Sequence, residues 1–191
     1  LNLIYFLIKY VVEKIMIKKE EVHGIIAATM SVLKSDLTLD NEKTLKHAEN
    51  LLESGSNFVV FFGSTGQSQL LSHFEKIQFI KYCAQSKYKE RFIIGTGSNS
   101  LQENIEILKL SQENGMFLSL LMGSAYFSYD DMGAYQWFKK VIKKIPKSKI
   151  ILYNFEKLSG YKFSKNLVQK LAKDFPQIIG VKDSTANLYT E

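Results

Sequence analysis

The chain has 191 residues, of which 46% are hydrophobic and 23% are charged. This composition is typical of a globular domain with a sizeable core, and it excludes an intrinsically disordered or fibrous protein. With two prolines and no Gly/Ser-rich linker, the chain shows no internal domain boundary, so we predict one domain. The single Cys83 excludes an internal disulfide and fits a reducing, cytoplasmic location.

The chain begins with an apolar stretch, LNLIYFLIKYVVEKIMI, at residues 1–17. Three charged residues interrupt it, and it is shorter than the roughly 20 residues that a bilayer-spanning helix needs. It also lacks the small-residue cleavage site of a signal peptide, so we expect no membrane segment. We interpret residues 1–21 as an N-terminal extension. Because Met16 would make a natural start, residues 1–15 of it are interpreted as upstream read-through.

Short apolar runs alternate with amphipathic stretches along the rest of the chain. The runs are apolar on both faces, which is the pattern of buried parallel strands. We predict strands at 24–29, 57–63, 91–97, 115–123, 149–154 and 177–183, with helices near 41–54, 70–88, 99–114, 131–145 and 164–174. The alternation predicts an α/β fold with a parallel sheet, either doubly wound or a (β/α)8 barrel.

Capping residues support several of these helix boundaries. Asp40 and Ser164 stand where N-caps are expected, and Gly55 and Gly115 stand where helices commonly stop. The densest basic stretch, KKVIKKIPKSK at 139–149, has lysines at helical spacing opposite apolar residues. This is typical of a solvated helix face, and no aromatic RNA-binding motif or zinc finger accompanies it, so we expect no nucleic-acid partner.

Polar residues follow the predicted strands, at the edge where parallel α/β proteins bind ligands. The turn Gly63-Ser64-Thr65-Gly66 follows the second strand, and it could cradle a phosphate, form a plain turn or grip a carboxylate. A P-loop needs Lys-Ser/Thr after the second glycine, whereas this chain has Gln-Ser. GTGSNS at 95–100 lacks the third glycine of a dinucleotide fingerprint. The three histidines are scattered, so we expect no metal site.

A lysine stands on the last predicted strand, in IIGVKDS. Burial lowers the pKa of an amine towards neutrality, which would make Lys182 a competent nucleophile for carbonyl carbons. The alternatives are that Lys182 reaches the solvent at the rim or pairs with Asp183. Tyr153 ends the preceding strand, and a barrel would bring its phenol close to the amine, where a proton donor and acceptor is needed. A core or rim tyrosine remains the alternative.

Taken together, the motifs resemble those of the dihydrodipicolinate synthase and N-acetylneuraminate lyase family, the pyruvate-dependent class I aldolases. The resemblance covers about residues 22–190 and is carried by GSTGQSQLLSHFEK, GTGSNSLQENIEI, YNFEKLSG and IIGVKDSTAN, in the family's order. It implies a (β/α)8 barrel of the TIM type. About six of its βα units are present, so we predict a partial barrel domain at 22–191.

The resemblance also implies roles for individual residues. Lys182 would form an imine with pyruvate or a 2-keto-3-deoxy acid, and Tyr153 would shuttle protons. Gly63, Ser64 and Thr65 would hold the keto-acid carboxylate. Tyr126, in GSAYFSYDDMG, would act across the interface of a homodimer or homotetramer. No metal or dissociable cofactor is implied. The expected activity is pyruvate condensation with an aldehyde, or cleavage of a 2-keto-3-deoxy acid.

This chain departs from the family pattern at several positions. Gln67 replaces the usual glutamate, and Ser124-Ala125-Tyr126 replaces a Pro-Tyr-Tyr/Phe segment. Leu158 stands where synthases generally carry an arginine that grips the second substrate's carboxylate, with Lys157 beside it. A complete barrel takes about 250 residues. We therefore keep a second hypothesis, a truncated, non-catalytic barrel homologue that binds a small keto acid.

Overall fold

The computed structural model describes residues 22–185, so the predicted N-terminal extension at 1–21 and residues 186–191 lie outside the described residues. Six strands form one parallel sheet in chain order. They are β1 (Ile26–Ala28), β2 (Phe58–Phe61), β3 (Phe92–Gly95), β4 (Leu118–Met122), β5 (Lys149–Asn154) and β6 (Ile178–Asp183). Every predicted strand is confirmed, although most are one to four residues shorter than predicted.

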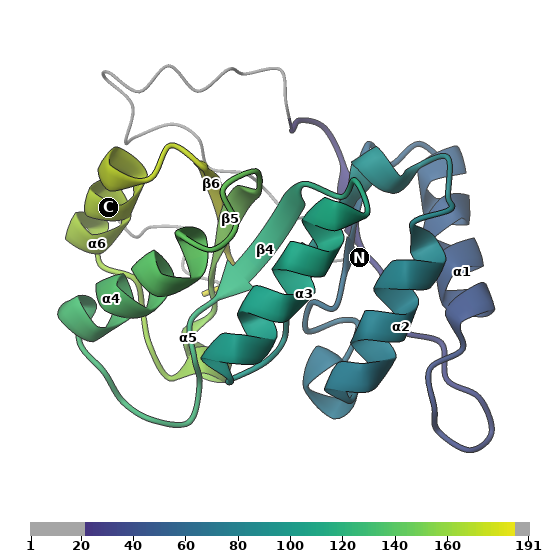
Figure 1. Cartoon of the computed structure of the whole chain (residues 1–191), viewed down its shortest axis with the longest axis horizontal. Coiled ribbons are helices and arrows are strands. Elements are labelled where there is room, and N and C mark those ends of the chain that lie inside the picture. Colours follow the sequence, from purple (N-terminus) through teal and green to yellow (C-terminus); the bar gives the residue numbers. More distant parts are fainter. Residues whose placement is uncertain (1–21, 186–191) are drawn as a thin grey trace.

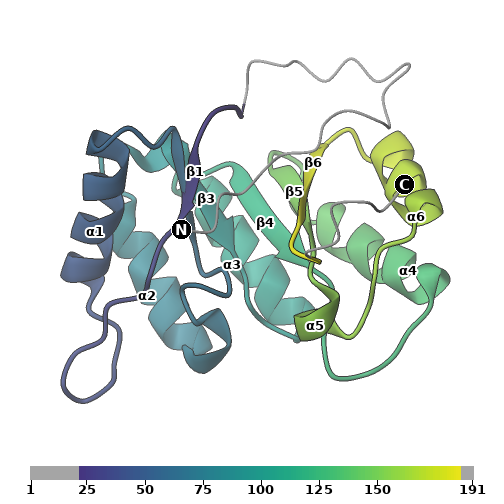
Figure 2. The same cartoon turned by 180° about the vertical axis from the view of Figure 1, so that it is seen from behind.

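Helices cover one face of the curved sheet, as the two opposite views show (Figures 1 and 2). They are α1 (Asn41–Glu53), α2 (His73–Cys83), α3 (Leu101–Glu113), α4 (Asp131–Ile142), α5 (Glu156–Ser159) and α6 (Lys165–Asp174), with short 3-10 helices η1 (Ser68–Leu70) and η2 (Lys89–Arg91). Between residues 22 and 185 no helix is both long enough and apolar enough to cross a bilayer.

The alternation of side chains along each strand divides the core into an outer and an inner part. Two outer clusters pack the strands against the helices; Phe61, Phe79 and Phe92 meet edge to face in one of them. A separate inner cluster lies on the other face of the sheet, and its last member along the chain is Tyr153. The inner cluster forms the floor beneath the polar residues that follow the strands.

The predicted caps at Asp40 and Ser164 are confirmed, since each side chain accepts a hydrogen bond from a backbone N–H of the first turn. The predicted helix at 70–88 is wrong at both ends. The chain forms η1 first, and α2 then begins after Ser72, whose side chain and Glu75 form a reciprocal capping box. The capping box fixes the start of α2 after Ser72, so residues 70–72 are not part of this helix.

Candidate functional site

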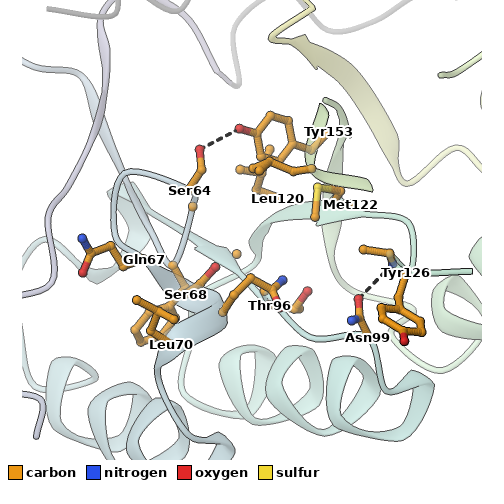
Figure 3. Close-up of a pocket in the computed structure, with 17 residues that line it drawn as sticks. Ser64, Gln67, Ser68, Leu70, Thr96, Asn99, Leu120, Met122, Tyr126 and Tyr153 are labelled. Carbon is orange, nitrogen blue, oxygen red and sulfur yellow. Dashed lines mark hydrogen bonds between the residues drawn. The ribbon is translucent and has the colours of Figure 1, made fainter. Parts of the chain in front are cut away.

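A pocket of about 490 Å³ lies at the carboxyl ends of the strands, between the segments that follow β2, β3, β4 and β5. Seventeen residues line it (Figure 3). Gly63, Ser64, Tyr126 and Tyr153, all predicted from the sequence as site residues, are among them. The strand ends therefore bring together residues that are up to 90 positions apart in the chain.

The turn after β2 is joined to β5 by a direct hydrogen bond. The oxygens of the Ser64 hydroxyl and the Tyr153 phenol lie 3.0 Å apart, and either can donate (Figure 3). Tyr153 is buried at the end of its strand, whereas Ser64 is exposed on the turn. Thr65 is also exposed but does not line the pocket, so the turn contributes one of its two hydroxyls to the cavity wall.

Lys182 lies beside Tyr153 on the inner face of the sheet. The two residues are register partners in the parallel pair β5 and β6, and they therefore project to the same side. The Lys182 Nζ atom lies 4.0 Å from the centroid of the Tyr153 ring, and Lys182 is only 8% exposed. The Lys182 amine therefore lies next to the Tyr153 ring, and the Tyr153 phenol lies next to the Ser64 hydroxyl. Lys182 itself is not among the residues that line the pocket.

Asp183 does not share this arrangement. It follows Lys182 on the strand and so projects to the opposite face. Its carboxylate accepts hydrogen bonds from the Asn154 amide nitrogen at 3.1 Å and from the Thr185 backbone N–H and hydroxyl at 2.7 Å each. Asp183 therefore fastens the end of β6 to its surroundings, and pairing of Lys182 with Asp183 is not the arrangement that the structure has.

Tyr126 lies in the segment between β4 and α4, on the side of the pocket near Asn99 (Figure 3). It is 88% exposed, and its ring meets that of the exposed Phe127 edge to face, with centroids 5.0 Å apart. The Asn99 side-chain oxygen accepts a hydrogen bond of 2.9 Å from the Ala125 N–H, which holds this segment against the loop after β3. An exposed aromatic pair therefore stands at the pocket's rim.

Backbone strain is concentrated at this site. Four residues other than glycine have positive φ angles in the described part of the chain, and three of them line the pocket: Phe62 (57°), Gln67 (51°) and Tyr126 (82°). Each such conformation costs of order 1–3 kcal/mol and persists only where the surroundings impose it. Residues held in this way cluster at binding and catalytic sites, which supports a functional role for the pocket independently of the sequence motifs.

The sequence did not identify Lys76, which is buried and contacts two residues that line the pocket. This residue of α2 is 3% exposed, and its ammonium donates to the backbone carbonyls of Thr96 and Gly97 at 3.0 Å each. Burial lowers the pKa of Lys76 to about 8, against a smaller opposing effect of the carboxylates of Glu103 and Glu75. Lys76 therefore holds the pocket-lining loop after β3 in place.

The remaining titratable residues do not form a metal site. Within residues 22–185 no group of three or more His, Cys, Asp or Glu side chains is arranged to hold a metal ion. His73 instead contacts Glu106, with Nε2 3.0 Å from the carboxylate. Cys83 is buried, and its burial raises the pKa of the thiol to about 12. The polar side chains that line the pocket thus carry phenols, hydroxyls and amides, and the Lys182 amine lies beside the Tyr153 ring.

These features define a class of protein: an α/β protein with a parallel strand order β1 to β6 and a ligand pocket at the carboxyl ends of its strands. Residues 21–191 match the model of the dihydrodipicolinate synthetase family, so the chain belongs to that family. The predicted fold is confirmed, because barrel structures of the family match most of this chain and the six strands form part of such a barrel.

Relatives with known activities or ligands are similar along most of the chain. The 4-hydroxy-tetrahydrodipicolinate synthase of Chloroherpeton thalassium is 27% identical over 90% of this chain and 57% of its own length. The structure of dihydrodipicolinate synthase from Acinetobacter baumannii complexed with pyruvate is 32% identical, with a TM-score of 0.76 over 85% of this chain and 56% of its own. A prophage protein of the family from E. coli K12, in complex with pyruvate, is 25% identical, with a TM-score of 0.78 over 85% and 54%.

This chain therefore spans about half the length of the relatives that it matches.

Proposed function

We propose that this protein is a Schiff-base-forming aldolase that condenses pyruvate with an aldehyde or cleaves a 2-keto-3-deoxy acid, with Lys182 as the nucleophile. The observation that carries the proposal is the continuous group formed by the Lys182 amine, the Tyr153 ring 4.0 Å away and the Ser64 hydroxyl 3.0 Å beyond the phenol. The pyruvate complexes of two relatives support pyruvate as the donor.

The proposed reaction needs only groups of this kind. The Lys182 nitrogen attacks the keto carbon, and the carbonyl oxygen leaves as water after taking up two protons, which gives a protonated imine. Loss of a methyl proton from the imine gives an enamine, whose carbon attacks the aldehyde carbon while the aldehyde oxygen takes a proton. Water then hydrolyses the product imine. Tyr153 donates and accepts these protons, relayed through Ser64.

The turn after β2 would bind the keto-acid carboxylate. Gly63 and Ser64 line the pocket, and Thr65 lies next to them in the chain. Backbone N–H groups and hydroxyls can bind an anion without a cation next to the imine nitrogen. Such a cation would disfavour protonation of the imine, on which enamine formation depends. A carboxylate-binding site made of uncharged groups therefore suits the proposed reaction.

Borohydride reduction in the presence of pyruvate tests the proposal. In the intact protein, reduction should attach a reduced pyruvyl group to the peptide that contains Lys182, detectable by mass spectrometry, and omission of pyruvate should abolish it. Lys76 is the informative internal control, because it is the other buried lysine of residues 22–185 and carries the lowered pKa. Labelling of Lys76, or of no lysine, would show that the proposal is wrong.

One observation favours a second candidate, a non-catalytic protein that binds a keto acid without covalent chemistry: Lys182 does not line the pocket. Such a protein would retain pyruvate binding in Lys182→Ala, measured by calorimetry, and would show no borohydride adduct. The aldolase proposal instead expects Lys182→Ala to lose the adduct together with most of the pyruvate affinity, because the covalent bond contributes to that affinity.

The proposal extends to assembly. Tyr126 and Phe127 form an exposed aromatic pair at the pocket's rim, and aromatic residues are enriched in the cores of protein interfaces. We infer that Tyr126 acts beside the site of a second copy in a homo-oligomer. Tyr126→Ala should then lower both the oligomer's stability, measured by sedimentation, and the rate of aldol chemistry.

A further inference from the structure

We infer that a β-bulge in β6 turns Lys182 towards Tyr153, and that Asn154 and Asp183 are positioning residues that hold the strand in this register. The inference rests on the proposed function and adds what orients the proposed nucleophile. It comes from the pairing of β5 with β6. Asn154 and Asp183 are the register partners that directly follow the pair formed by Tyr153 and Lys182.

One residue of β6 has no partner on β5. Ile150 pairs with Ile178, whereas the next residue of β5 pairs with Gly180. Ile179 is therefore an extra residue, which makes this part of β6 a β-bulge. Bulges are common beside active sites, where they change the direction in which the following side chains point. Beyond the bulge the pairing is regular up to the end of the strand.

The packing of β6 shows the same change of face. In a regular strand, residues three positions apart lie on opposite faces. Ile178 and Val181 are three apart, yet both pack in the same outer cluster. Ile179 packs against the inner cluster, and Lys182, three positions further on, lies beside the ring of Tyr153 in that cluster. Without the bulge, Lys182 would therefore face the helices.

The alternative to the bulge is a slip of β6 by one residue, which moves every following side chain to the other face. In the slipped strand Val181 would lie opposite Tyr153, and Lys182 would lie opposite Asn154 on the outer face. The amine would then be on the wrong side of the sheet for a keto acid bound in the pocket. Gly180 loses no side-chain packing when it changes face, so contacts beyond the bulge decide the register.

A hydrogen bond between Asn154 and Asp183 favours the observed register. The Asn154 amide nitrogen donates to the Asp183 carboxylate at 3.1 Å, on the face opposite to Lys182. The Asn154 amide oxygen accepts from the Phe163 N–H at 3.2 Å. The Asp183 carboxylate also accepts from the Thr185 N–H at 2.7 Å. Both partners are thus fixed, and a slip by one residue would separate them.

Exchange of the two side chains tests this role in the intact protein. Asn154→Asp places a second carboxylate against Asp183, and at mildly alkaline pH the two charges repel each other. The rate of borohydride-trapped adduct formation with pyruvate should fall about tenfold or more, because the hydrogen bond is lost and a repulsion replaces it. The double variant Asn154→Asp/Asp183→Asn should recover most of the rate, since the amide and the carboxylate then exchange places and keep the same partners.

Deletion of Ile179 is an independent test of the bulge. The deletion leaves a regular strand in which Ile178, Gly180 and Lys182 keep their present partners. Combined with Asn154→Asp, it should therefore restore adduct formation, whereas a defect of folding alone would become worse. An unchanged rate in Asn154→Asp, or a loss that neither the exchange nor the deletion reverses, would overturn the inference.

Acetylation measures the orientation of Lys182 without pyruvate. Lys182 is 8% exposed, whereas Asp183, whose place it would take after a slip, is exposed. Acetic anhydride should therefore label Lys182 severalfold faster in Asn154→Asp than in the unsubstituted protein, with the buried Lys76 as the internal reference. Faster labelling, without a pyruvate adduct in the unsubstituted protein, would contradict only the proposed function. An adduct in both proteins, with equal labelling and trapping rates, would contradict only this inference.

Discussion

Lys76 and Lys182 are both buried, and only their surroundings distinguish them. The Lys76 ammonium donates hydrogen bonds to two backbone carbonyls, and these bonds stabilise the loop after β3. Lys182 contacts an aromatic ring whose hydroxyl belongs to the pocket. The lowered pKa of Lys76 does not by itself make that residue the proposed nucleophile. The proposal for Lys182 rests on its neighbouring proton donor and acceptor, Tyr153.

The role proposed for Tyr153 can be tested by removing one oxygen. Tyr153→Phe keeps the ring beside Lys182 but loses the partner of the Ser64 hydroxyl. Imine formation should slow by about 10² to 10⁴-fold, the usual contribution of a general acid or base. The measurement is the rate at which the borohydride-trapped pyruvate adduct appears.

Tyr129→Phe is a matched control for this substitution. The Tyr129 hydroxyl is buried and has no hydrogen-bond partner in the described structure, and burial raises the pKa of this phenol to about 12. The trapping rate should therefore stay at the level of the unsubstituted protein. Equal rates for Tyr153→Phe and Tyr129→Phe would exclude Tyr153 from proton transfer.

Lys76 predicts a pH dependence of stability. Its pKa is about 8 in the folded protein and 10.5 ordinarily, so between these values the unfolded chain binds more protons than the folded chain. The free energy of unfolding should therefore rise with pH from 8 to 10.5, by at most about 1.4 kcal/mol per pH unit. The neutral amine still has hydrogens for both carbonyls, so deprotonation need not release the loop.

Urea unfolding of the intact protein and of Lys76→Met across this pH range measures the effect. Lys76→Met should be less stable throughout, because the carbonyls of Thr96 and Gly97 lose their donor. Only the difference in slope reports the titration, since other lysines and tyrosines titrate in the same range in both proteins. If the unfolding free energy of the two proteins changed with pH by the same slope, the lowered pKa of Lys76 would be contradicted.

At the scale of elements, β3 lies so close to the end of β2 that it admits no side chain at Gly95. A Cβ atom there would lie 2.7 Å from the Phe62 carbonyl oxygen and 2.9 Å from that of Phe61. Gly95→Ala should therefore displace the turn after β2, destabilise the protein by about 1–3 kcal/mol and weaken pyruvate binding. Chemical denaturation and calorimetry measure the two effects.

Gly63→Ala is the control for this substitution at the neighbouring strand end. Its Cβ would meet only Val60 Cγ1, at 3.8 Å, which is an ordinary contact. The unfolding free energy should therefore change little. Equal destabilisation by the two substitutions would show that the close approach of β2 and β3 is not what requires glycine at position 95.

Strands were easier to predict than the site that they support. Runs that are apolar on both faces identified all six strands. A strand in a parallel sheet is buried on both faces, so most of its residues are apolar. The helix α5 was missed, since four residues are too few for a periodic pattern.

The parts of the site that the sequence could not predict depend on tertiary contacts. The positive φ angles of Phe62, Gln67 and Tyr126 fall on residues that seldom adopt them, and their surroundings impose these conformations. The burial of Lys76 was missed because a lysine on an amphipathic helix normally faces solvent. Tyr153 and Lys182 could be paired in advance because their strands are neighbours and both residues lie near the strand ends.

At the scale of the whole molecule, the sheet is open within residues 22–185. Strands β1 and β6 each pair with a single neighbour there, whereas the relatives are nearly twice as long. The inner cluster extends from Ile26 to Tyr153 across this sheet, and a closed barrel would cover it from every side. Within residues 22–185, the proposed partial barrel thus has two sheet edges and one face available for further contacts.

This geometry predicts the behaviour of the 191-residue chain expressed alone. Unpaired strand edges and an open apolar face favour self-association, so the chain should bind the dye ANS and sediment as concentration-dependent oligomers. Fusing two βα units from a family member after residue 191 should reduce ANS fluorescence severalfold and give a defined species, because the added strands would pair with both edges. A chain that is monomeric and free of ANS binding on its own would show that its edges and inner face are covered in another way.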